Sequence, residues 1–74
     1  MLTLQKVKER REFLRVARLA FSLEAANWDE NYFINELGFT AEDYSEAVEK
    51  FDQIFSLPAP QLDALFDVVF PDAP

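Results

Sequence analysis

The sequence contains no histidine and no cysteine, and it has a single glycine, Gly38. Without imidazole or thiol side chains, the chain lacks the ordinary ligands of zinc, haem and iron–sulfur sites and the usual nucleophile–base pairs. One glycine cannot form a glycine-rich phosphate-binding loop, and the sequence has no calcium-binding loop motif. We therefore expect a protein that is not an enzyme and that holds no metal ion and no cofactor.

Long apolar runs are also missing. The stretch from Phe13 to Ala26 comes nearest to a membrane span, but Arg15, Arg18 and Glu24 interrupt it. A span needs about 18 consecutive apolar residues, so we expect no membrane contact of this kind, and for the same reason no secretory signal. The absence of cysteine is compatible with a reducing cytoplasm, where we place the protein.

The composition that remains favours a small helical protein. Half of the 74 residues are hydrophobic and eight are phenylalanine, which is too apolar for a disordered chain, and the shortage of turn residues disfavours a β-rich fold. We predict an all-α bundle of about four helices in one domain spanning 1–74, with the N-terminal helix longest and central. A chain of this length buries only about 60% of its unfolded surface, so a partner or a second copy is plausible.

The first and last predicted helices have recognisable start and stop residues. The first extends from Thr3, a suitable N-cap, to Ala25, with no glycine or proline between them. Its second half is apolar around most of its circumference, so this helix is either central or covered by an interface. A fourth helix is predicted from Pro60 to Phe70, because proline is tolerated in a first turn and another proline follows. We expect residues 71–74 to form a frayed tail.

The second predicted helix is short and runs from Trp28 to Leu37. Asn27, with Glu30 three residues later, has the spacing of a capping box at its start. Gly38 follows its end as a residue that adopts positive φ without steric cost.

A third helix begins immediately afterwards. Thr40 and Asp43 form a second N-cap pair, and Phe39 is expected to contact Ile34 across the preceding helix end. A proline ends this helix at or before Leu57.

The spacing of these two short helices resembles that of a DNA-binding helix-turn-helix. The third helix carries five acidic residues against Lys50, however, a net charge of −4 that duplex DNA would repel. We therefore predict a structural helical hairpin, with nucleic acid an unlikely partner.

The formal charge of −7 is unevenly distributed along the chain. Six of the seven basic residues lie within the first eighteen positions, which also contain two glutamates and therefore have a net charge of +4. The residues after Arg18 include one lysine and twelve acidic residues. Four of the basic residues fall at i, i+3, i+7 and i+10 and so form one stripe on the first helix: Lys8, Arg11, Arg15 and Arg18. This stripe is interpreted as solvated or paired with the acidic third helix; the alternatives are an acidic protein partner, nucleic acid or a membrane.

The last two helices carry an acidic face that could dock on a basic surface of a larger protein. This face comprises Glu42, Glu46, Glu49, Asp52, Asp63 and Asp67; its alternative interpretation is ordinary solubility. Trp28 and Tyr32 form an aromatic patch of the kind that anchors interfaces, although such residues are also common in cores. We predict an inhibitor, adaptor or regulator that works by protein–protein contact, of the small acidic type encoded by phages and mobile elements.

Self-association is the alternative prediction. The first helix has more apolar surface than one neighbour can cover, and a homodimer through Val16, Leu19 and Leu23 would bury the excess.

Overall fold

The computed structural model describes residues 3–71, and its regular elements there are all helical. The α-helices are α1 (Leu4–Ala25), α2 (Ala41–Phe55) and α3 (Ala59–Val69), and a short π-helix, η1 (Tyr32–Glu36), lies between α1 and α2. The predicted all-α fold with its longest helix at the N-terminus is confirmed. Residues 72–74 of the predicted tail lie outside the described residues.

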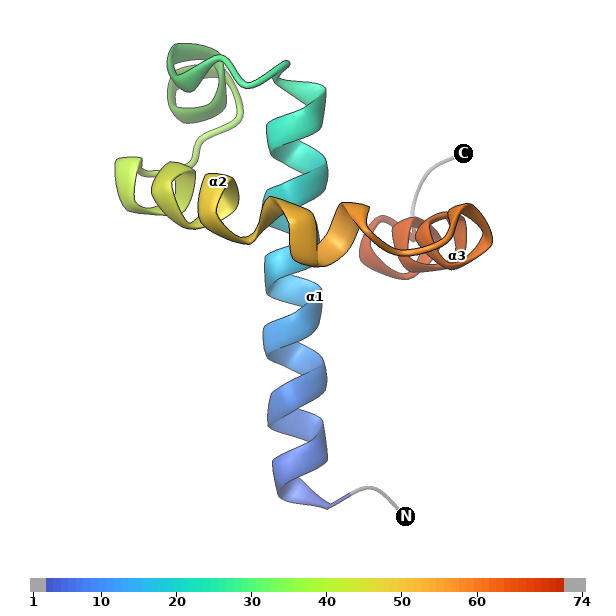
Figure 1. Ribbon diagram of the computed structural model, residues 1–74. Helices are drawn as coiled ribbons and strands as arrows, with labels where there is room; N and C mark the ends of the chain where they lie inside the picture. Colours follow the sequence, from blue (N-terminus) through green and yellow to red (C-terminus); the bar gives the residue numbers. More distant parts are fainter. Residues whose placement is uncertain (1–2, 72–74) are drawn as a thin grey trace.

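α1 is the central element. α2 and α3 both pack across its C-terminal half, while its N-terminal half extends away from them (Figure 1). The molecule is elongated as a result, with principal extents of 42 × 25 × 24 Å.

Two hydrophobic clusters share α1 and form the core. The first joins α1 to η1 and the start of α2, and its buried members are Leu19, Leu23, Ala26, Phe33 and Ala47. The second joins α1 to the end of α2 and to α3 through the buried residues Val16, Ala17, Ala20 and Ile54, against which Leu62, Leu65 and Val69 of α3 pack. Because α1 supplies residues to both clusters, its apolar second half is covered from two sides.

This packing corrects the residues predicted for self-association. Val16, Leu19 and Leu23 are exposed by only 3%, 3% and 0%, because α2, α3 and η1 cover the face of α1 on which they lie. They hold the fold together and are not accessible to a second copy of the folded chain.

The start of the second helix also differs from its prediction. Asn27 and Trp28 have φ of 54° and 62°, so the chain leaves α1 through two left-handed residues, a conformation that asparagine tolerates better than most. Asp29 is the residue that caps the next turn: its Oδ1 accepts from the backbone N–H groups of Asn31 and Tyr32, at 2.9 and 3.2 Å. The predicted capping box at Asn27 and Glu30 is therefore wrong.

The second helix ends in a π-helical turn instead of an α-helical turn. The Leu37 N–H donates to the carbonyl of Tyr32 at 3.1 Å, a bond that spans five residues. Gly38 follows with φ +82°, as predicted. The extra residue shifts the closing contact by one position, so Phe39 stacks on Phe33, with ring centroids 4.5 Å apart, where a regular helix would have placed Ile34.

The remaining boundaries agree with the sequence-based expectations. Thr3 caps α1 through a bond from the Lys6 N–H. Thr40 and Asp43 form a complete capping box at the start of α2, with bonds of 3.0 and 3.1 Å. α2 ends at Phe55, before the proline that was expected to stop it.

Candidate functional site

An ion-pair cluster fixes α2 on α1. The guanidinium of Arg15 bonds to both Glu12 and Glu46, at 2.8 Å from Nη1 to Glu46 Oε1, and Lys50 Nζ donates to Glu46 Oε2 at 3.0 Å. The hydrogen bond from Arg15, aided by Lys50, lowers the pKa of Glu46 to about 2. The bond from Arg15 also lowers the pKa of Glu12, and both carboxylates raise the pKa of Arg15. Glu46 is thus paired within the chain where α2 meets α1, and it lies apart from the outward acidic positions.

The four residues of the basic stripe lie in three different environments. Arg15 joins the cluster with Glu46, as expected for a stripe paired with the acidic third helix. The guanidinium of Arg18 lies over the Phe39 ring, 5.6 Å from its centroid, in cation–π geometry. Lys8 and Arg11 are exposed on the projecting half of α1.

Three of the predicted carboxylates share the outer face of α2. Glu42, Glu49 and Asp52 are exposed and fall on the side of the helix opposite to the buried Ala47 and Ile54. Within residues 3–71, every ion pair involves Arg15 or Glu46, so these three carboxylates have no ion-pair partner. We call Glu42, Glu49 and Asp52 the acidic face of α2.

The two remaining carboxylates, Asp63 and Asp67, lie on α3. Both are exposed and sit one turn apart on the same side of the helix. They therefore form a separate negative pair on another helix.

The predicted aromatic patch is split between two environments. Trp28 is 42% exposed and lies against Phe51 of α2, with ring centroids 4.7 Å apart. The Tyr44 hydroxyl donates to the carbonyl of Trp28 at 3.0 Å and so fixes this backbone position. Tyr32 is 47% exposed and lies on η1, where it lines a different surface.

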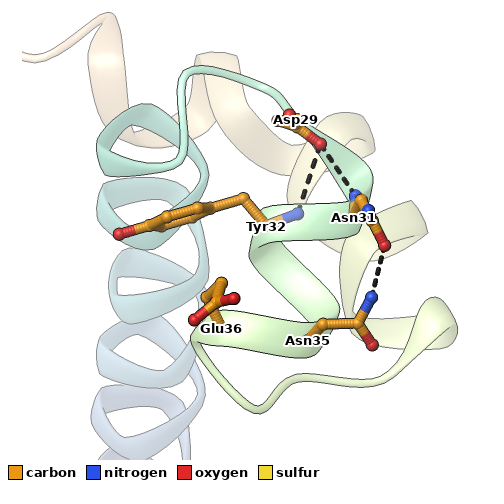
Figure 2. Close-up of a pocket in the computed structure, with 5 residues that line it drawn as sticks. All are labelled: Asp29, Asn31, Tyr32, Asn35 and Glu36. Atoms are coloured by element: carbon orange, nitrogen blue, oxygen red, sulfur yellow. Dashed lines mark hydrogen bonds between the residues drawn. The ribbon is translucent and has the colours of Figure 1, made fainter.

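Tyr32 belongs to a polar hollow of about 230 Å³ on the outside of η1. Figure 2 shows Tyr32 and Glu36 extending toward the same side, while Asp29, Asn31 and Asn35 are linked by hydrogen bonds along the helix. Asp29 is occupied by its capping bonds to the Asn31 and Tyr32 N–H groups. In the part of the chain that the structure describes, no group of three acidic residues is arranged to hold a metal ion.

A second hollow is apolar, and it was not predicted from the sequence. It has a volume of about 290 Å³ and lies along the last turns of α1, between the end of η1 and α3. We call it the apolar groove; its lining residues are Phe21, Ser22, Ala25, Leu37, Phe66 and Phe70. One wall is aromatic, since Phe66 lies 5.2 Å from Phe21 and 4.9 Å from Phe70 between ring centroids.

A signal for the groove was present in the sequence. Phe66 and Phe70 are four residues apart and so lie on the same side of α3. Ser22 and Ala25 are small residues on the side of α1 away from the core. Only the fold, however, brings these two helices and Leu37 together.

Comparisons with protein-family models, with curated proteins and with solved structures find no match to this chain. Between Thr3 and Pro71, none of the helices is long and apolar enough to cross a membrane.

Proposed function

We propose that this chain is a non-enzymatic binding protein, whose acidic face of α2 docks on a basic surface of a larger protein and thereby blocks or recruits it. The observation that carries the proposal is the set of three exposed carboxylates, Glu42, Glu49 and Asp52, without cationic partners among the described residues. Like charges on one helix face are mutually unfavourable. A basic partner surface would relieve that repulsion and steer the encounter.

The neighbouring surface supports the same proposal. Trp28 lies against α2 through Phe51 and keeps 42% of its surface exposed. A partly exposed tryptophan beside a charged face is a common anchor in protein interfaces. Asp63 and Asp67 on α3 add to the negative potential of the molecule, while Glu46 is excluded from the contact by its pairing with Arg15.

We also propose the biological setting in which this docking takes place. A small acidic regulator of this kind suits a phage or mobile element acting on a host protein in the cytoplasm. A net charge of −7 makes nucleic acid an unfavourable partner for the body of the molecule.

The test is capture of partners from host-cell lysate by three immobilised proteins: the natural chain, a Glu49→Lys plus Asp52→Lys variant, and a matched control. The control, Glu24→Lys plus Glu30→Lys, changes the net charge equally at two exposed positions away from α2. We expect a partner that the natural chain and the control retain, that high salt releases, and that the α2 variant loses. Equal retention by all three proteins at all salt concentrations would contradict the proposal.

A further inference from the structure

Among the residues that the structure describes, no other element covers the first half of α1, which forms a helical arm. We define the arm as residues 4–12; Figure 1 shows it extending beyond α2 and α3. Within residues 3–71, the members of both hydrophobic clusters begin only at Phe13. The sequence explains this limit, because Gln5, Glu9 and Glu12 occupy the positions that continue the buried face of Val16 toward the N-terminus.

The arm nevertheless has an apolar stripe. Leu4 is 72% exposed and Val7 lies one turn further along the same side. The exposed cations Lys8 and Arg10 flank this stripe on its two sides, and the arm carries four basic residues against two glutamates. Helical turns that lack tertiary packing have little stability of their own, so a covering partner would stabilise the arm.

The apolar groove has the complementary pattern. Ser22 and Ala25, which have small side chains, form the floor of the groove. Leu37 forms one wall, and Phe66 and Phe70 form the other. The α3 wall is edged by carboxylates, since the exposed Asp63 and Asp67 each lie one turn before a wall phenylalanine. The exposed Glu36 precedes Leu37 and lines the neighbouring polar hollow.

We propose that the apolar groove receives the arm of a second copy of this chain. Leu4 and Val7 would enter the groove, and a cation beside them would meet Asp63 and Asp67 at the α3 edge. The pairing matches an apolar stripe flanked by positive charge to an apolar groove with negative charge along its α3 edge. Arg18, one turn below the groove, has its guanidinium over the Phe39 ring, 5.6 Å from the ring centroid.

Each copy carries both an arm and a groove, so an exchange of arms between two copies closes as a dimer. This association uses neither the acidic face of α2 nor Trp28. It therefore stands or falls independently of the proposed docking on a basic partner.

The test measures molar mass by light scattering and sedimentation equilibrium, over a range of protein concentrations at low and high salt. We expect a dimer at low salt that dissociates as salt screens the charges. Lys8→Glu plus Arg10→Glu in the arm, or Asp63→Lys plus Asp67→Lys beside the groove, should each raise the dissociation constant about tenfold or more. The chain with all four substitutions should regain the affinity of the natural chain, because the charges are again complementary.

The control variant is Glu42→Lys plus Glu49→Lys, which alters the acidic face of α2 and should leave the dimer unchanged. All substituted positions are exposed, and far-ultraviolet circular dichroism verifies that each variant is folded. A monomer at every concentration would overturn the proposal. So would a dimer that neither reversal weakens, or a four-substitution chain that does not regain affinity.

Discussion

Glu46 and its neighbours on α2 show how one turn of helix separates a structural carboxylate from one available to a partner. Glu46 lies on the flank that faces α1, where Arg15 and Lys50 bond to it. Glu49, three residues later, lies on the outer face and is exposed. The sequence did not distinguish these two residues, because helical spacing shows only that both lie on the polar half of α2. It does not show at which edge of that half a neighbouring helix supplies an arginine.

The Glu46 pairing predicts a pH-dependent contribution to stability. Since Arg15 lowers the pKa of Glu46 from 4.5 to about 2 in the folded chain, the charged form stabilises the fold above pH 4.5, and this contribution is lost as pH falls toward 2. Glu46→Gln should lower the free energy of unfolding by about 1 kcal/mol at neutral pH, typical of a partly exposed ion pair. Urea unfolding should show the difference shrinking as pH falls below 4.5 and vanishing below about pH 2.

Glu49→Gln is the matched control for this experiment, because it makes the same chemical change on the same helix at an exposed carboxylate. It should change the stability by less than about 0.5 kcal/mol. A Glu46→Gln variant that behaves like this control at neutral pH would show that the cluster does not stabilise the fold.

At the scale of elements, α1 is one helix whose two halves have different surroundings. From Phe13 onward it is packed by α2, α3 and η1, whereas the arm before Phe13 has polar residues on the continuation of the same face. The apolar excess of the second half was predicted correctly, but it is covered by the chain's own helices. Periodicity showed that several neighbours were needed and could not show that they came from the same molecule.

This division predicts a large effect of one substitution in the packed part of α1 and a small effect of the same substitution in the arm. Leu23→Ala should lower the free energy of unfolding by about 2–5 kcal/mol, because the side chain is fully buried and its removal leaves a cavity. Leu4→Ala removes the same atoms from a residue that is 72% exposed and should cost less than about 0.5 kcal/mol. Thermal unfolding at low protein concentration, where copies do not associate, measures both; equal effects would contradict this account of the core.

The short η1 element was the least predictable part of the fold. Its end was correctly located at Gly38, because a residue with φ +82° requires the freedom of glycine. Its start was not, since Asn27, Asp29 and their neighbours offer competing caps and only the turn after Ala26 selects Asp29. In the π-turn, Phe33 stacks on Phe39 and meets the Tyr44 ring edge to face, contacts that helical periodicity did not indicate.

At the scale of the whole molecule, the charge separation read from the sequence persists in three dimensions. Arg15 bridges the basic and acidic parts at one place, while Lys8 and Arg11 remain exposed on the arm and the acidic face of α2 remains exposed on the body. The helices, their order and this charge division followed from composition and periodicity. The apolar groove did not, because it is formed by three segments that are distant in sequence.

The most direct test of the proposed docking maps the contact on this chain itself. Amide chemical shifts of the isotopically labelled protein would be recorded before and after addition of a partner captured from host lysate. We expect the largest changes at Glu42, Glu49 and Asp52 and at the Trp28 indole, and high salt should reverse them. Changes confined to the arm or to the apolar groove, with the acidic face of α2 unaffected, would contradict the proposed docking.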